Sequence, residues 1–321
     1  MSNSTLEYDL DSLTVEQYFG YFPSLALAGT ATGLYYAAAL IVTAQLIYKR
    51  NRNAWFMLLV VLTALAEAGG YVAMIWMVKN SGQASLFSAY VAMQCLIVLS
   101  PNVLQAASYT TVGKISTIAK MHTKSKFLKP KAISWGFVGL DLFALIVQAV
   151  GISIWATQKS SGDPVVSTVK LGSWITVAGL GLQLVSFCLF TLLAVWIQRH
   201  KDNKFRGYKA HKWLFLGVYG AIFFITIRNV FRFVEFTQSA VKYPDPGGLT
   251  ENQTLFYALE TLPILLAFAV FIVLSPIFLL PTTPLHDYIP DETDEDAMEK
   301  AGKEFSSATE TEEFETVELA A

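Results

Sequence analysis

The sequence has little charge, and the charge that it has is unevenly spread. Asp, Glu, Lys and Arg make up 15% of its 321 residues and apolar residues make up 54%, whereas a soluble domain averages about a quarter charged residues. A single soluble core of this size would need more charged surface to stay in solution. The composition therefore argues against a soluble enzyme and indicates a protein that crosses a membrane several times.

Cysteine and histidine are also scarce. The two cysteines, Cys95 and Cys188, lie within long apolar runs, so we expect them to pack inside the protein and to form no outer disulfide. No imidazole is available inside these runs to bind zinc or haem iron, so we expect no metal site and no cofactor. The four histidines all fall between or after the runs: His122, His200, His211 and His286.

Sequence motifs of catalysis are missing. Residues 113–116 read Gly-Lys-Ile-Ser, but they lack the upstream glycine of a phosphate-binding loop. The chain therefore has no nucleotide-hydrolysing site of the usual kind. No serine stands in a nucleophile motif beside a histidine. We expect a protein that is not an enzyme and has no catalytic residues.

Acidic and basic residues separate along the chain. Residues 282–321 hold 13 acidic residues against two lysines, which gives them a net charge of −11. Residues 1–281 hold 21 basic and 12 acidic residues, a net charge of +9. The overall net charge of −2 averages these opposite parts, so it says little about partners. The composition also argues against a nucleic-acid partner.

Seven continuous apolar stretches are each long enough to cross a bilayer as a helix, because a hydrocarbon core about 30 Å thick takes about 20 residues. They are not the alternating segments of a membrane β-barrel, so the expected fold class is all-α, a polytopic seven-helix transmembrane bundle. In the first stretch, Gly29 and Gly33 have the spacing that favours close packing against another helix of the chain. The predicted spans are Ser24–Ile47, Ala54–Val78, Ala84–Val112, Ala132–Ala156, Leu171–Ile197, Trp213–Phe236 and Thr254–Leu280.

Basic residues orient the predicted bundle. The loops after the first, third and fifth spans carry 15 Lys and Arg residues, the other loops carry four, and the chain before the first span carries none. Basic loops stay in the cytosol, so we expect the N-terminus outside and the C-terminus inside. We divide the chain into an extracellular tail (1–23), the transmembrane domain (24–280) and an acidic, disordered cytosolic tail (281–321). Asn3, in an Asn-Ser-Thr sequence, is the expected glycosylation site.

Charged residues inside the predicted spans are the strongest functional signal, because charges at membrane depth are usually functional or paired. At 1.5 Å per residue, Glu67, Arg228 and Glu260 come to about the same depth, roughly 20 Å from the cytosolic side. Arg228, Arg232 and Glu235 follow at i, i+4 and i+7, on one face of one helix. Six charges lie within the spans: Glu67, Asp141, Arg228, Arg232, Glu235 and Glu260.

Neutral polar residues stand at helical spacing from these charges or from one another, so the polar faces should converge on an interior that opens outward. The acids there outnumber the arginines four to two, so the site suits a cationic amphiphile. The alternative is a structural ion-pair network that binds no ligand. The expected substrate-binding residues are Glu67, Tyr71, Asp141, Gln148, Gln183, Arg228, Arg232, Glu235, Tyr257 and Glu260.

Several short motifs resemble those of one family. Residues 21–24 read Tyr-Phe-Pro-Ser, residues 67–71 have the form E-x-x-G-Y, and residues 228–236 read R-x-x-x-R-x-x-E-F inside an apolar run. From about Tyr21 to Leu280 the sequence resembles the fungal lipid-translocating exporter family, seven-span proteins of aminocholesterol resistance and sphingoid-base release. The resemblance implies a fungal protein of the plasma membrane or another endomembrane. It also implies roles in release of sphingoid bases, in resistance to toxic lipids and, in one branch, in porphyrin traffic.

Three functions are consistent with these features. The first is a translocator or exporter of amphiphilic lipids such as sphingoid long-chain bases, with membrane lipids as its partners and substrates. The second is a seven-helix receptor-like lipid sensor, although topology alone is only analogy. The third is a porphyrin or haem carrier, for which the missing intramembrane histidine is unfavourable. The sequence leaves the oligomeric state open.

The acidic tail generates a first testable prediction. Residues 290–321 are rich in Asp and Glu and poor in apolar residues, so they cannot bury enough apolar surface to fold. Deleting them should leave folding and basal transport unchanged, as measured by size-exclusion profile in detergent and by lipid transport after reconstitution. A truncated protein that aggregates in detergent would instead show that the tail packs on the bundle.

Overall fold

A computed structural model of the chain describes residues 15, 19, 21–80, 86–118, 130–159, 165–199, 210–242 and 252–280. Seven helical segments in these residues are long and apolar enough to span a membrane, so the chain is a multi-pass membrane protein and the predicted all-α, seven-helix fold is confirmed. The first six spans comprise α2 (Leu25–Lys49), η2 (Arg52–Met57) with α3 (Leu58–Lys79), α4 (Leu86–Ile118), α5 (Pro130–Lys159), α6 (Val166–Arg199) and α7 (His211–Lys242).

The seventh span is a composite of different helix types. It begins with α8 (Gln253–Phe256), passes through a π-helical turn, η5 (Tyr257–Thr261), and continues as α9 (Leu262–Val273). A short helix, α10 (Pro276–Leu279), follows a break in the backbone pattern. The π-helical turn is a local widening of the helix, and such turns occur frequently at functional sites.

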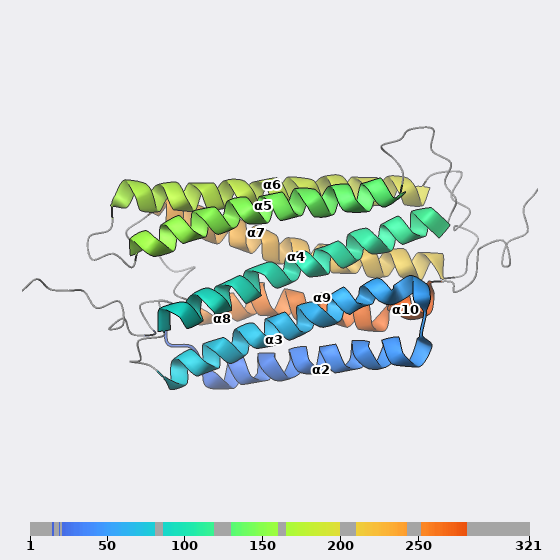
Figure 1. Ribbon diagram of the computed structural model, residues 1–321, viewed down its shortest axis with the longest axis horizontal. Helices are drawn as coiled ribbons and strands as arrows, with labels where there is room; N and C mark the ends of the chain where they lie inside the picture. The colour runs from blue at the N-terminus through green and yellow to red at the C-terminus, as the bar shows by residue number, and fades with distance from the viewer. Residues whose placement is uncertain are drawn as a thin grey trace, which may run out of the picture.

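The helices run side by side along the long axis of the molecule (Figure 1). The pair α5 and α6 forms one edge, the pair α2 and α3 forms the opposite edge, and α4, α7 and α9 lie between them. This arrangement places α4 against both α3 and α5, and α7 against both α6 and α9. The helices that carry the predicted site residues therefore meet in the middle of the bundle.

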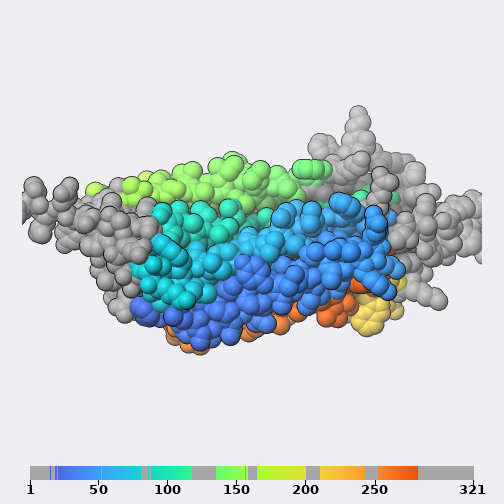
Figure 2. Space-filling view, turned by 60° about the horizontal axis from the view of Figure 1, so that its bottom comes forward, coloured from blue at the N-terminus to red at the C-terminus, as the bar shows by residue number. Residues whose placement is uncertain are grey.

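The outer surface of the bundle is apolar, as a lipid-facing surface must be. Large side chains such as Leu40 on α2 and Val273 on α9 are more than two thirds exposed, and Figure 2 shows this surface over α2, α3 and α4. Cys95 and Cys188 are exposed as well. The prediction that the cysteines pack inside the protein is therefore wrong, because both lie on helix faces that point away from the neighbouring helices.

Threonine hydroxyls inside the spans are satisfied by their own helices. Most donate a hydrogen bond to the carbonyl four residues earlier, which removes the cost of a free hydroxyl at membrane depth. The threonines that do so include Thr32, Thr43, Thr63, Thr110, Thr111, Thr191, Thr226 and Thr237.

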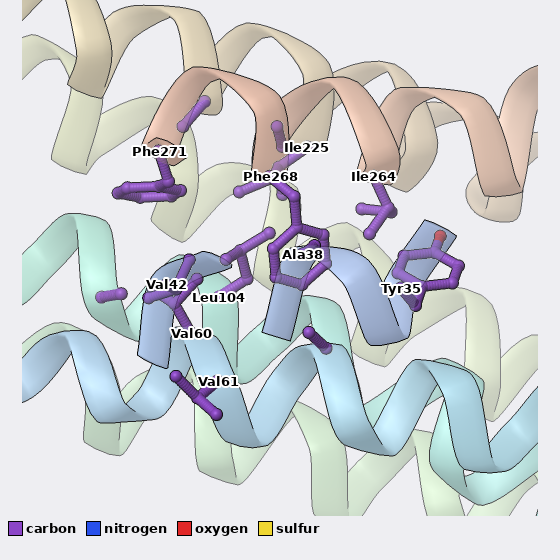
Figure 3. Packing of buried hydrophobic residues seen from close by; sticks show 14 of the residues in the cluster. Tyr35, Ala38, Val42, Val60, Val61, Leu104, Ile225, Ile264, Phe268 and Phe271 are labelled. Carbon is purple, nitrogen blue, oxygen red and sulfur yellow. The ribbon is translucent and has the colours of Figure 1, made fainter. Parts of the chain in front are cut away.

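A cluster of buried apolar side chains joins α2, α3, α4, α6, α7 and α9 in the bundle, and Figure 3 shows part of it. Tyr35, Ala38 and Val42 of α2 lie one turn apart and face α9. The cluster positions these helices relative to one another. The labelled members on the other helices are Val60, Val61, Leu104, Ile225, Ile264, Phe268 and Phe271.

Glycines hold α5 and α6 together backbone against backbone. A methyl group on Gly151 would lie 2.6 Å from the carbonyl oxygen of Gly172, and one on Gly172 would lie 2.8 Å from that of Gly151. Two turns beyond Gly172 on α6, a methyl group on Gly179 would lie 2.9 Å from the carbonyl oxygen of Ala144. Such close approach is typical of membrane helices with small residues at their interface.

The predicted close packing at Gly29 and Gly33 is wrong. Among the described residues, no atom lies within 4 Å of a methyl group placed on either glycine. Both face outward on α2, because the side of α2 that packs against the bundle carries Ala28, Ala31 and Tyr35 instead. The two glycines have the spacing of a helix-packing motif, but no other described helix packs against them.

Some predictions fall outside the described residues. These are the N-terminal tail with Asn3, apart from the few described residues before α2, and the acidic tail from residue 281 onward. The three-part division of the chain and the orientation of the bundle also stay predictions.

The glycine contact between α5 and α6 predicts a position-dependent effect of alanine on one helix. Gly151→Ala should destabilise the protein by about 1–3 kcal/mol, because its methyl group meets backbone atoms that cannot rotate away. Gly139→Ala is the matched control on the same helix, since nothing lies within 4 Å of its methyl group. The control should be neutral or slightly stabilising, because alanine is the better helix former. Thermal unfolding in detergent measures both, and equal midpoints would contradict the close packing.

Candidate functional site

Two arginines and one glutamate on α7 form the first part of the site. Arg228, Arg232 and Glu235 lie on the face of α7 that turns toward the seventh span. Arg228 is 1% exposed and Glu235 is 16% exposed, so burial decreases along the helix from Arg228 to Glu235. We call these residues, together with Glu260, Glu67 and Ser100, the arginine network.

Both arginines converge on one oxygen atom of Glu260. The Nε and Nη2 atoms of Arg228 lie 3.0 and 2.8 Å from Glu260 Oε1, and Nη2 of Arg232 lies 2.9 Å from the same oxygen. Nη1 of Arg232 also donates to Glu235 Oε2 at 3.0 Å. Glu260 Oε2 is buried and has no hydrogen-bond partner among the described residues. The contact therefore joins α7 to the seventh span and leaves one acidic oxygen unused.

The π-helical turn η5 carries Glu260 and is itself held by tyrosines. Thr261, the last residue of η5, accepts a hydrogen bond at its carbonyl from Tyr35 (3.2 Å), and its hydroxyl pairs with that of Tyr71 (2.5 Å). The rings of Tyr35 and Tyr71 stack with centroids 5.7 Å apart. Tyr257, at the start of η5, stacks on Tyr71 with centroids 6.2 Å apart. Helices α2 and α3 thus fix the turn that presents Glu260.

Arg228 also donates a hydrogen bond to a backbone carbonyl of α4. Pro101 lies inside α4, and because proline has no N–H, the carbonyl of Ile97 loses the donor that would normally lie four residues later. Nη2 of Arg228 donates to that carbonyl at 3.2 Å. A free carbonyl at membrane depth must find a partner inside the protein, so Arg228 ties α7 to α4 as well as to Glu260.

Glu67 joins the arginine network through α4. Ser100, which directly precedes Pro101, donates a hydrogen bond to Glu67 Oε1 at 2.5 Å. Glu67 is buried, and among the described residues no cation lies within ion-pair distance of it. It therefore adds a third acid to a network with two arginines.

Tyr21, which precedes α2, covers the less buried end of this network. It lies close enough to Glu235, Arg232 and Tyr257 for their charges to act on its phenol. Burial raises the pKa of Tyr21 above its usual range, so this phenol stays neutral.

Asp141 is the centre of a second buried group, between α4, α5 and α6. Its Oδ2 atom accepts hydrogen bonds from Gln105 Nε2 at 3.0 Å and from the Tyr109 hydroxyl at 2.6 Å. Ser186 on α6 lies beside both Tyr109 and Asp141. Asp141 Oδ1 and Ser186 Oγ have no partner with hydrogen-bond geometry among the described residues.

Amide side chains extend this second group along α4 and α6. Gln148 Nε2 donates to Gln183 Oε1 at 2.9 Å. Gln183 Nε2 donates in turn to Asn102 Oδ1 and, at 3.5 Å, to Gln105 Oε1. We call Asp141, Gln105, Tyr109, Ser186, Gln148, Gln183 and Asn102 the aspartate network.

The structure thus divides the predicted site into two networks. Glu67, Arg228, Arg232, Glu235 and Glu260 come together in one, with Tyr71 and Tyr257 stacked beside it. The other contains three of the predicted residues: Asp141, Gln148 and Gln183. The sequence predicted one common polar interior. In the structure the polar residues form two groups, and α4 contacts both of them, the arginine network through Ile97 and Ser100 and the aspartate network through Asn102, Gln105 and Tyr109.

Several members of the networks are not among the expected substrate-binding residues. Asn102, Gln105 and Tyr109 follow at i, i+3 and i+7 on α4, so their helical spacing could have identified them. Ser100 and Thr261 carried no such signal, because a single hydroxyl in a span usually bonds its own backbone. In the described residues, no group of three or more His, Cys, Asp or Glu side chains could hold a metal ion.

Comparison with known proteins supports the resemblance seen in the motifs. Residues 60–283 match the family described as "RTA1 like protein". The chain is 23% identical over 273 residues to a protein of Emericella nidulans named "Probable lipid transporter atnI", covering 82% of this chain and 67% of that protein. No solved structure is significantly similar to the chain.

Two relatives from Saccharomyces cerevisiae match shorter segments. "Protein RTA1" is 26% identical over 202 residues, which covers 62% of this chain and 60% of that protein. "Sphingoid long-chain base transporter RSB1" is 25% identical over 176 residues, which covers 55% of this chain and 43% of that protein. The matches thus span between about two fifths and two thirds of the lengths of these three fungal relatives.

The family match includes the helices that carry both networks, from α3 to α10, and it covers more than half of the chain. It also agrees with the resemblance indicated by residues 67–71 and 228–236. The chain therefore belongs to the RTA1-like protein family of fungi.

Proposed function

We propose that this chain moves an amphiphilic lipid across the membrane, and that its substrate is a sphingoid base or a related lipid with a cationic head group. Two of the three relatives are named as lipid transporters, one of them for sphingoid long-chain bases. Those names favour neither a receptor-like sensor nor a porphyrin carrier. They also support a protein that is not an enzyme.

The observation that carries the proposal is the excess of acid in the arginine network. Glu67, Glu235 and Glu260 face two arginines, so the network has a net charge of −1 when all five groups are ionised. Glu260 Oε2 has no partner. An ammonium head group carries one positive charge and three donors, so it would balance the charge and use the free oxygen. The apolar helix faces around the network suit an alkyl chain.

The proposed substrate-binding residues come from both networks and from the stacked tyrosines. The arginine network would hold the head group, and the aspartate network would line the remainder of a polar route through the bundle. The proposed residues are Glu67, Tyr71, Asp141, Gln148, Gln183, Arg228, Arg232, Glu235, Tyr257 and Glu260.

We place the protein in the plasma membrane or another endomembrane of a fungus, with the N-terminus outside and the acidic tail in the cytosol. The orientation rests on the excess of basic residues in alternate loops. The sequence contains no phosphate-binding loop, so net transport would follow a lipid gradient or the gradient of a coupled ion.

Reconstitution tests the proposal. Liposomes that contain the full-length protein should move a labelled sphingoid base between leaflets faster than protein-free vesicles. An N-acetylated base has the same tail without the charge, so it should compete at least about tenfold less well, because one charge-assisted hydrogen bond is worth about 1.5–3 kcal/mol. Equal rates with and without protein would refute the transport function. Equal competition by the neutral analogue would refute the cationic substrate alone.

Arg232 separates a binding role from a purely structural one. Arg232→Ala removes the contacts to Glu235 and Glu260 and should cost roughly 3–5 kcal/mol of stability, because a buried acid loses its partner. Arg232→Lys should restore only part of this, since lysine lacks the planar fork. Lys242→Ala, at the exposed end of the same helix, is the control and should match wild type.

The unfolding midpoint and the transport rate are to be measured on the same preparations of these variants. If the network binds substrate, the alanine variant that still folds should lose more transport than its stability loss explains. A purely structural network predicts losses of the same size in both measurements. If Arg232→Ala has the unfolding midpoint and the transport rate of wild type, Arg232 has neither the binding role nor the structural role.

A further inference from the structure

Among the described acids of the two networks, Asp141 and Glu67 have no ion-pair partner, and Asp141 belongs to a network that has no other charged member. Asp141 is 4% exposed. Its Oδ2 atom accepts from Gln105 and Tyr109, and its Oδ1 atom has no partner. In contrast, Glu235 and Glu260 pair with arginines. A buried carboxylate without a counter-charge is strongly unfavourable at membrane depth.

The helices packed against Asp141 supply no cation to it. On α4, the groups that face it are Gln105 and Tyr109, of which only the tyrosine can titrate. On α6, the group that faces it is Ser186. The basic residue of α4 nearest in sequence, Lys114, is five residues beyond Tyr109, about 7.5 Å further along the axis. Among the described residues, no ion pair includes Asp141.

We propose that Asp141 is a proton-binding site and that it exchanges this proton during lipid transport. A proton on Oδ1 neutralises the group and can be donated to Ser186 Oγ, so one proton satisfies the two oxygen atoms that lack partners. Oδ2 keeps its role as acceptor from Gln105 and Tyr109. The whole aspartate network is then neutral and fully hydrogen bonded around Asp141.

The donor and acceptor pattern favours a proton over a sodium ion. Sodium would need several oxygen ligands with free lone pairs at one point. Here the amide oxygens of Gln183 and Asn102 already accept hydrogen bonds, and Oδ2 of Asp141 accepts two. Among the described members of the aspartate network, Asp141 Oδ1 and Ser186 Oγ are the buried atoms without a hydrogen-bond partner, and they suffice for one proton.

The location of Asp141 suits a group whose charge controls a helix contact. Asp141 and Gln148 lie on α5, and Gln183 and Ser186 lie on α6, which is bound to α5 through the glycine contacts. Their partners Gln105, Tyr109 and Asn102 lie on α4. Loss of the proton would place an uncompensated charge between α4 and the α5–α6 pair, and binding of the proton would remove it.

The transport role of this proton depends on the proposed function, but the site itself does not. If one proton moves for each cationic lipid in the opposite direction, no net charge crosses the membrane. A proton gradient could then drive lipid movement without nucleotide hydrolysis. The existence of the proton on Asp141 can be measured without any lipid.

Infrared difference spectroscopy on the purified full-length protein tests the site. A step from low to high pH should remove carbonyl bands of protonated carboxyl groups in wild type, and one of these bands, that of Asp141, should be missing in Asp141→Asn. Asp163→Asn, the same change between the fourth and fifth spans, is the control and should keep the band. If Asp141→Asn does not fold, Tyr109→Phe serves instead. It removes a donor to Oδ2, so it should shift the band to higher frequency.

A set of carboxyl bands that is the same in Asp141→Asn as in wild type, or in which no band moves in Tyr109→Phe, would overturn the proposal. So would a wild-type protein that has no such band at any pH.

Reconstituted protein tests the exchange. The substrate should be a sphingoid base whose amine is replaced by a guanidinium group, which stays charged at every pH used and keeps its N–H donors, and valinomycin with equal potassium should hold the membrane potential at zero. A difference of one pH unit should then accumulate the lipid about tenfold in wild type, the ratio for one proton per lipid. Asp141→Asn should give no accumulation, although it can still equilibrate the lipid.

The outcomes are distinguishable from failure of the proposed function. Wild-type vesicles that move no lipid at all would refute transport, while the infrared result would still decide the proton site. Wild-type vesicles that move lipid without responding to the pH difference would refute the exchange. Accumulation driven by a sodium gradient at equal pH would refute the choice of the proton.

Discussion

The position of the central helices depends on one oxygen atom, Glu260 Oε1, to which both arginines of α7 donate. Inside a bilayer, a guanidinium group has no water to bind, so its partner must come from the protein. Arg228 has a second partner, the Ile97 carbonyl of α4. The two arginines therefore tie α7 to the seventh span through Glu260, Arg228 also ties α7 to α4, and the apolar cluster around Phe268 packs between the same helices.

The irregular parts of the backbone lie at this same place. Pro101 frees a carbonyl in α4, and the π-helical turn η5 widens the seventh span at Glu260. Each irregularity would be costly against lipid, but here side chains of neighbouring helices bond to backbone carbonyls: Arg228 to that of Ile97 in α4, and Tyr35 to that of Thr261 in η5. The Thr261 hydroxyl pairs with Tyr71. Irregular backbone at membrane depth is tolerated where it is buried in protein, so these contacts explain why the two irregularities occur together.

Much of the fold could be predicted because apolar length alone identifies a spanning helix, and helical rise alone gives depth. That arithmetic placed Arg228 and Glu260 at one level, and the structure brings them to 2.8 Å. What could not be predicted is which helix faces meet. Gly29 has the same local pattern as a packing glycine, yet it faces outward, whereas Gly151 and Gly172 carry no strong motif and touch through their backbones. The pairing of Arg228 with Ile97, 131 residues away, also needs the three-dimensional arrangement.

The two networks differ in what must break when helices move apart. Separating α7 from the seventh span would break ion pairs to a buried acid, at several kcal/mol. Separating the α5–α6 pair from the rest would break the hydrogen bonds of Asp141 and Gln183 to α4 and that of Tyr219 to Gln198. No ion pair among the described residues crosses that second boundary. The glycine contacts keep α5 and α6 together, so hydrogen bonds and the apolar side chains of α6 in the central cluster hold this boundary, and the charge of Asp141 acts directly on it.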